Sequence, residues 1–168
     1  MKHLYFVRHG ESELNAQRIF AGQTDTPLTE RGRAEANAAG EQVVHLPIDA
    51  IVASPLSRAL ETARIIASHI DYPLSEIIIN DIFKERSLGT LEGKSWDEYS
   101  ETATGDNGAE TDAELLTRAQ AGLAFLKSLP ADNILLVGHG SFSRALRTAI
   151  DPSQTYDEPE NAKLVQFI

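Results

Sequence analysis

MKHLYFVRHGESELN, residues 1–15, is the stretch that decides the fold. Leu4–Val7 form an apolar run that is typical of a buried strand, and the run stops at Arg8 and His9. In open α/β sheets ligands bind at the carboxyl ends of the strands, so this break is a candidate binding site. Arg8 carries donors suited to phosphate or carboxylate, and His9 can exchange protons near neutral pH. The alternative interpretation is a basic turn in which His9 is merely solvated.

Length and composition predict one globular domain that comprises residues 1–168. Hydrophobic residues make up 42% of the chain and charged residues 24%, as in ordinary globular proteins of this size. The net charge of −10 argues against a nucleic-acid-binding surface. Cysteine is absent, which excludes disulfides, thiolate catalysis and cysteine-rich zinc sites. No signal peptide or membrane-spanning run is evident, so we expect a cytoplasmic protein that binds neither membranes nor nucleic acid.

Strand and helix patterns alternate along the chain. Apolar runs predict strands at 4–7, 48–53, 77–83, 134–137 and 164–168. Helical patterns are found at about 29–45, 55–70, 111–129 and 142–149, with a short helix at 95–99 and a polar loop at 104–108. Thr29 and Ser54 are the expected N-caps of the first two helices. Such alternation indicates an α/β fold whose mostly parallel sheet is covered by helices on both faces.

Chemistry-bearing residues follow the predicted strands. Arg8 and His9 come directly after the first strand, Arg58 lies in the helix after the second, Glu85 follows the third strand region and His139 follows the run at 134–137. In a parallel sheet these loops share one rim. Taken singly, Arg58 could be a solvated helix residue and Glu85 a surface charge. Their joint placement is much harder to explain by chance.

This set of side chains matches what phosphoryl transfer requires. Two guanidiniums neutralise the nonbridging oxygens of a phosphoryl group, and a neutral imidazole can attack phosphorus to form a covalent intermediate. A carboxylic acid can protonate the departing alkoxide and later activate water. A second imidazole can stabilise the charge that develops on the equatorial oxygens. None of these roles requires a metal ion or another cofactor.

Five short blocks of sequence stand in a characteristic order. They are Arg8 to Ser12 with Asn15, Leu28 to Gly32, Ser54 to Ala59 with Thr62 and Ala63, Glu85 with Gly89, Glu92 and Gly93, and Gly138 to Gly140. Together they resemble the histidine phosphatase superfamily, also called the phosphoglycerate mutase-like family. An isolated Arg-His-Gly is weak evidence, but five blocks in order, spread over nearly the whole chain, are highly specific.

The resemblance implies a role for each catalytic candidate. His9 would be the nucleophile that becomes phosphorylated, and Arg8, Arg58 and His139 would form the phosphate pocket. Glu85 would be the proton donor. The substrate implied is a small-molecule phosphomonoester, and the chain is expected to act as a monomer or homodimer.

The resemblance also implies further substrate contacts and a fold. Asn15 matches a residue that contacts phosphate in the family, and Gln23 and Thr24 fall in a polar loop that reaches the substrate there. The family fold is a three-layer α/β/α sandwich with a mostly parallel central sheet, in agreement with the alternation of strands and helices.

Two features of the sequence bear on whether water or a second hydroxyl accepts the phosphoryl group. Mutases of the family carry a long insertion between the acid-bearing loop and the second histidine, whereas here His139 lies only 54 positions after Glu85. A short cap leaves the site more open to water. In addition, Ser141 and Phe142 follow His139 and Gly140, whereas mutases of the family usually have His-Gly-Asn at this point. Phe142 could pack in the core or line the leaving-group pocket. We therefore predict a phosphatase; a mutase and a phosphate-binding module without turnover are the alternatives.

Overall fold

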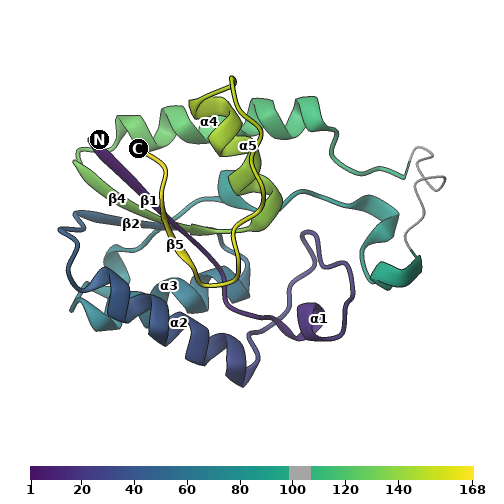
Figure 1. Cartoon of the computed structure of the whole chain (residues 1–168), viewed down its shortest axis with the longest axis horizontal. Coiled ribbons are helices and arrows are strands. Elements are labelled where there is room, and N and C mark those ends of the chain that lie inside the picture. The colour runs from purple at the N-terminus through teal and green to yellow at the C-terminus, as the bar shows by residue number, and fades with distance from the viewer. Residues whose placement is uncertain (99–106) are drawn as a thin grey trace.

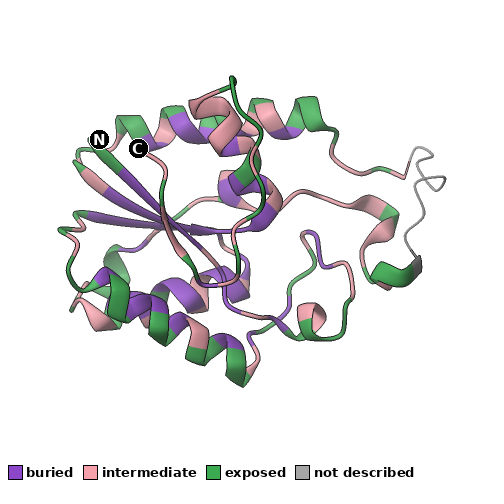
Figure 2. Cartoon of the chain, viewed as in Figure 1, coloured by how far each residue is buried: buried purple, intermediate pink, exposed green. Residues whose placement is uncertain are grey.

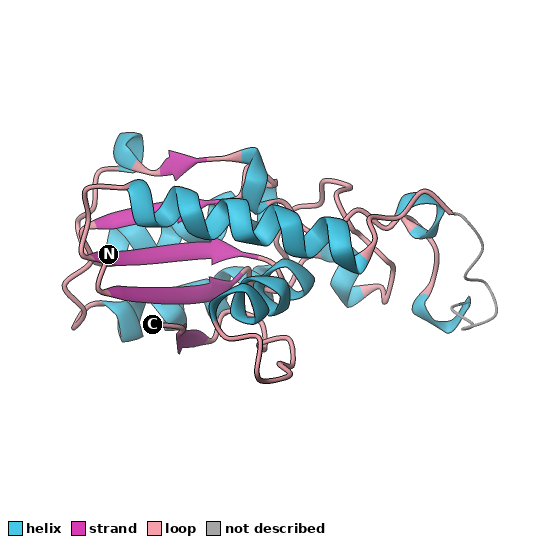
Figure 3. Cartoon of the chain, turned by 90° about the horizontal axis from the view of Figure 1, so that it is seen from above, coloured by secondary structure: helices cyan, strands magenta, loops and turns pink. Residues whose placement is uncertain are grey.

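A five-stranded sheet forms the centre of the computed structural model, which describes residues 1–98 and 107–168. Its spatial order is β3-β2-β4-β1-β5. The strands are β1 (His3–Arg8), β2 (Ala50–Ala53), β3 (Ile78–Ile79), β4 (Asn133–Gly138) and β5 (Leu164–Gln166). All neighbours pair in parallel except β5, which runs antiparallel to β1. Viewed from above, the long strands lie side by side with the same direction (Figure 3).

Helices cover both faces of the sheet, as Figure 1 shows. One face carries α2 (Glu30–Val43) and α3 (Ser57–His69), and the other carries α4 (Asp112–Ser128) and α5 (Gly140–Ile150). The predicted three-layer α/β/α class with a mostly parallel sheet is therefore confirmed. Within the described ranges, no helix is both long enough and apolar enough to cross a lipid bilayer.

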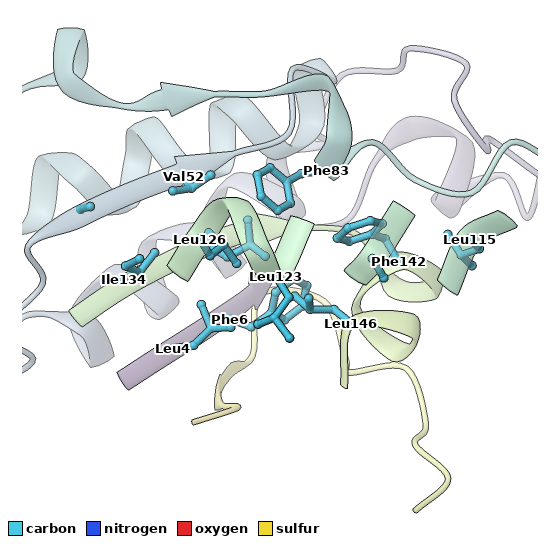
Figure 4. Packing of buried hydrophobic residues seen from close by; sticks show 13 residues of the cluster. Leu4, Phe6, Val52, Phe83, Leu115, Leu123, Leu126, Ile134, Phe142 and Leu146 are labelled. Carbon is cyan, nitrogen blue, oxygen red and sulfur yellow. The ribbon is translucent and has the colours of Figure 1, made fainter. Parts of the chain in front are cut away.

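The core lies on both faces of the sheet, which explains why Leu4–Val7 of β1 are all apolar. Successive side chains of a strand point to opposite faces, and both faces of this sheet are covered, so every position must be apolar. Leu4 and Phe6 pack with Phe83 and Phe142 on the α4/α5 side (Figure 4). Tyr5 belongs to the separate cluster on the α2/α3 side. Buried residues accordingly follow the strands and the inner faces of the helices (Figure 2).

The helix starts show which local predictions are correct. Thr29 caps α2 as predicted, because its hydroxyl accepts a hydrogen bond from the Gly32 N–H. Ser54 does not cap α3, which begins at Ser57 with Leu56 at the N-cap position and no side-chain cap. Instead, the Ser54 hydroxyl accepts from the Leu56 N–H at 3.3 Å, within the loop that leads into the helix. Ser54 is therefore free to contact the neighbouring loop after β4.

The third strand region is shorter than predicted. β3 contains two residues, and the next residues, Asp81–Phe83, form a 3₁₀ helix. The Asn80 side chain accepts from the Ile82 N–H at 3.0 Å and so turns the chain out of the sheet. The predicted short helix at 95–99 is a 3₁₀ helix at Trp96–Glu98. Position 99 of that helix and positions 104–106 of the predicted loop lie outside the described residues.

Three further short helices lie in the described chain. They are α1 (Glu13–Ala16) and the 3₁₀ helices Leu74–Glu76 and Gly89–Leu91. α1, which the sequence analysis does not predict, begins with a capping box between Ser12 and Asn15. This turn follows Arg8 and His9 directly and fixes the course of the loop after β1.

Candidate active site

The loops after β1, β2 and β4 meet at one edge of the sheet and surround a cavity of about 220 Å³. The predicted site residues in its lining are Arg8, His9, Asn15, Arg58 and Glu85. His139 is fully buried next to it, and its ring centroid lies 5.2 Å from that of His9. The fold thus brings all five catalytic candidates to one place.

His9 is held as a neutral ring with a defined tautomer. Its Nδ1 lies 2.7 Å from the Gly10 carbonyl oxygen, which can only accept, so Nδ1 carries the proton. The Nε2 atom accepts a hydrogen bond from the Arg58 Nε at 3.2 Å. Burial and then the charge of Arg58 lower the pKa of His9 well below 6.5. The Nε2 atom is therefore unprotonated at neutral pH, and its lone pair points toward Arg58.

The backbone around His9 is fixed by close packing. The Gly10 N–H donates to the Thr62 hydroxyl at 3.1 Å, and the His9 N–H donates to the Gly138 carbonyl at 2.9 Å. A Cβ atom on Gly10 would overlap the Gly32 carbonyl. Glycine is therefore required at position 10, and the imidazole has little freedom to move.

Arg58 is a buried cation that no carboxylate pairs directly among the described residues. Its two terminal nitrogens donate to the Gly22 carbonyl at 2.7 Å and the Thr24 carbonyl at 3.0 Å, and its Nε donates to His9. Burial lowers the pKa of Arg58, but guanidinium stays charged in proteins. The site therefore holds a desolvated positive charge that an anion would compensate.

Glu85 lies against the N-terminus of α5. One of its carboxyl oxygens accepts from the Arg86 N–H at 2.9 Å and the Phe142 N–H at 3.0 Å, and the other accepts from the Ser141 N–H at 3.2 Å. Burial raises the pKa of Glu85, although these backbone donors act in the opposite direction. Glu85 therefore keeps a proton to higher pH than an ordinary carboxyl group.

His139 and Arg8 each hold a buried nitrogen without a hydrogen-bond partner in the described part of the chain: His139 Nδ1 and Arg8 Nε. The His139 Nε2 lies 2.8 Å from the Ser54 hydroxyl oxygen. Because that oxygen already accepts from Leu56, its proton can be donated to Nε2, which leaves the ring proton on Nδ1. Burial lowers the pKa of His139 well below 6.5. Two N–H groups thus remain to be satisfied, and the oxygens of a bound anion could accept from both.

The other predicted contacts divide into two groups. Asn15 lines the cavity, with its Oδ1 accepting from the Ser12 N–H. The side chains of Gln23 and Thr24 do not line it. Gln23 Nε2 donates to the Glu85 carbonyl at 2.9 Å, and the Thr24 hydroxyl donates to Glu92 at 2.6 Å. These two side chains therefore tie the loop at 22–24, whose carbonyls accept from Arg58, to the segment that carries Glu85 and Glu92.

The cavity also contains residues that the sequence analysis does not predict, among them Phe20, Trp96 and Glu158. Glu158 lies in the irregular segment between α5 and β5, and one of its carboxyl oxygens is 3.5 Å from the Arg8 guanidinium. The segment has no strand or helix pattern that would place it. Its one signal in the sequence is the group of acidic residues at 157–160 shortly before the last strand.

Sequence and structure comparisons agree on the relatives of this chain. The model of the histidine phosphatase superfamily (branch 1) matches residues 4–164. The uncharacterized phosphatase PhoE of Bacillus subtilis (strain 168) is 40% identical over 148 residues, which cover 86% of this chain and 75% of that protein. The probable phosphoglycerate mutase GpmB of Enterobacter sp. (strain 638) is 38% identical over 154 residues, covering 83% and 70%.

The structural comparison gives the same result. A mycobacterial glucosyl-3-phosphoglycerate phosphatase, solved with VO3, has a TM-score of 0.87 and 25% identity, with 99% of this chain and 92% of that chain covered. Both hydrolases and mutases are thus named among the relatives.

Proposed function

Because the chain belongs to the histidine phosphatase superfamily, we propose that it hydrolyses phosphomonoesters of small metabolites through a phosphohistidine on His9. One observation supports this more than any other: the hydrogen bonds of His9 fix its tautomer and leave Nε2 as an unprotonated acceptor beside Arg58. A neutral imidazole whose unprotonated nitrogen faces the cavity can act as a nucleophile.

The phosphate group binds between Arg8, Arg58 and His139. The Arg8 Nε and His139 Nδ1 have no partner in residues 1–98 and 107–168, so an anion satisfies them without breaking another bond. The Arg58 Nε turns its hydrogen bond from His9 to a phosphate oxygen, which frees the Nε2 lone pair. Binding the substrate therefore also releases the nucleophile.

In the first step, His9 Nε2 attacks phosphorus in line, and the bond from phosphorus to the ester oxygen breaks. Glu85 gives its proton to that oxygen, so the product leaves as a neutral alcohol. The raised pKa of Glu85 favours the protonated form that this step needs. The two guanidiniums offset the charge on the transferring group, and the His139 N–H stabilises its oxygens.

In the second step, water attacks the phosphorus of phosphohistidine and the bond to Nε2 breaks. Glu85, now a carboxylate, accepts the proton of that water, and inorganic phosphate leaves. His9 returns to its neutral state, because the Gly10 carbonyl holds its Nδ1 proton throughout. Each turnover thus restores the protonation of both residues.

The short chain between the acid and the second histidine favours water as the acceptor. Of the residues between Glu85 and His139, α4 and β4 belong to the body of the sandwich. Apart from the four-residue link at 129–132, the span leaves 26 positions, 86–111, outside these two elements. A small cap excludes less water, which supports hydrolysis over transfer to a second hydroxyl.

The experiment is a panel of phosphomonoesters assayed for phosphate release, beside an assay for conversion of 3-phosphoglycerate to 2-phosphoglycerate. We expect phosphate release that His9→Ala removes and His45→Ala, a substitution of an exposed histidine, retains. Isomerisation faster than phosphate release would establish a mutase. Phosphate binding without either activity would establish a binding module.

A further inference from the structure

The lining of the cavity carries little positive charge for a site proposed to bind a phosphate dianion. Next to Arg8 and Arg58, the wall is built of Ile19, Phe20, Leu88 and Trp96, with Glu85 and Glu158 as its acidic groups. No further lysine or arginine lines it among the residues that the structure describes. Among the described residues that line the cavity, the cationic side chains are therefore Arg8 and Arg58, the two arginines proposed to bind phosphate.

Glu158 is held in place from two sides. Its Oε1 accepts a hydrogen bond from the Ser141 hydroxyl at 2.9 Å, and its Oε2 lies 3.5 Å from the Arg8 guanidinium. Arg8 also donates to the Pro159 carbonyl at 3.1 Å, which ties this segment to the end of β1. A Cβ on Gly140 would overlap the Glu158 carboxylate, so glycine leaves the room that the carboxylate occupies. The position of this charge is thus defined by the fold.

Ser141 places Glu158 next to the proton donor. The Ser141 N–H donates to Glu85 and the Ser141 hydroxyl donates to Glu158, so the two carboxyl groups flank one residue. The ester oxygen of a substrate must reach Glu85 to be protonated. The atoms that follow this oxygen in the leaving group then lie beside Glu158.

From this arrangement, and on the basis of the function proposed above, we infer that Glu158 selects substrates by the charge of the leaving group. It favours phosphomonoesters of cationic or neutral alcohols, such as amino alcohols, and disfavours those whose leaving group carries a second anion, such as a carboxylate. An anionic leaving group would face a carboxylate at short range, and both arginines of the site would already be engaged by the phosphate. Like charges juxtaposed in this way are a common device for rejecting wrong ligands.

Three substrates with the same two-carbon skeleton test this inference. They are O-phosphoethanolamine, ethyl phosphate and 2-phosphoglycolate, whose leaving groups are cationic, neutral and anionic. We expect wild-type kcat/KM to be highest for phosphoethanolamine and lowest for phosphoglycolate. Glu158→Gln keeps the size of the side chain and its bond to Ser141. It should shift the ratio of kcat/KM for phosphoethanolamine to kcat/KM for phosphoglycolate by about tenfold toward phosphoglycolate, a modest factor because Glu158 is partly exposed.

Asp157→Asn is the matched control, because it removes the same charge from the adjacent exposed residue. It should leave the ratio unchanged. An unchanged ratio in Glu158→Gln, with ethyl phosphate still hydrolysed, would overturn the selectivity and leave the proposed function standing. A higher kcat/KM of the wild type for phosphoglycolate than for phosphoethanolamine would by itself overturn the proposed selectivity. No phosphate release from any phosphomonoester would overturn the proposed function and this inference together.

Discussion

Replacing Arg58 with methionine separates its role in binding from its role in folding. The side chain is 1% exposed and makes three hydrogen bonds, to the carbonyls of Gly22 and Thr24 and to His9. Methionine keeps much of the buried volume but removes the charge and all the donors. We expect phosphate affinity to fall steeply while the fold survives.

The expected magnitudes follow from these contacts. Truncating one partner of a buried, hydrogen-bonded charge pair costs about 3 kcal/mol, which is roughly a hundredfold in the Kd for phosphate. The lost bonds to the two carbonyls cost about 1 kcal/mol each. Removing a desolvated guanidinium that lacks a carboxylate partner offsets this cost. The Tm of the free variant should therefore lie within about 5 °C of the wild type.

Thermal unfolding in the presence of inorganic phosphate measures both effects. At a phosphate concentration of about 100 times the wild-type Kd, binding stabilises the wild type by about 2.7 kcal/mol, which raises its Tm by roughly 5–10 °C for a domain of this size. The variant, with a Kd a hundredfold higher, should gain about 1 °C at the same concentration.

Arg64→Met provides the control, because Arg64 is an exposed residue of the same helix. It should respond to phosphate like the wild type. An Arg58→Met variant that folds and still binds phosphate within threefold of the wild-type Kd would contradict a role for Arg58 in phosphate binding. In that case, Arg58 would serve only to hold the loop at 22–24.

Two further predictions concern protons. Glu85→Gln should lower kcat for alkyl phosphates by about a hundredfold or more and lower it less for aryl phosphates, whose leaving oxygens need little protonation; equal losses would assign Glu85 to positioning. Burial lowers the pKa of His9 and His139, so below pH 6.5 these two residues bind protons in the unfolded chain but not in the folded chain. The free energy of unfolding therefore does not carry this penalty above pH 6.5 and falls as the pH drops below it. Urea unfolding at pH 7 and pH 5 should show a smaller loss in His139→Gln than in the wild type, and equal losses would contradict burial as the cause.

The fold could be predicted from the sequence where local pattern and tertiary environment agree. Strands covered on both faces must be apolar throughout, so the runs at 4–7 and 134–137 identify β1 and β4. Thr111 begins α4 with a capping box to Glu114, a signal that acts within four residues. Phe142, which the sequence allows either in the core or in the leaving-group pocket, is fully buried and packs edge-on against Phe83 in the core.

The remaining features depend on contacts between distant parts of the chain. Isoleucine and phenylalanine at 82–83 suit a strand, but the Asn80 side chain ends the strand before them. Ser54 is a residue type that commonly caps helices, yet its hydroxyl forms a hydrogen bond with His139, 85 positions further along the chain. Glu158 reaches the site only because its segment is bound to Arg8. No local pattern contains this information.

The central claim is that His9 carries the phosphoryl group and that water normally removes it. Rapid quenching with a phosphate-labelled phosphomonoester tests it directly. We expect acid-labile, base-stable label on the peptide that contains His9, the same in His45→Ala, and neither label nor turnover in His9→Ala. If His9→Ala keeps its turnover while His139→Ala loses the labelled species, the two histidines are reversed; if the label passes to phosphoglycerate much faster than to water, the protein is a mutase and the argument from its short cap is wrong.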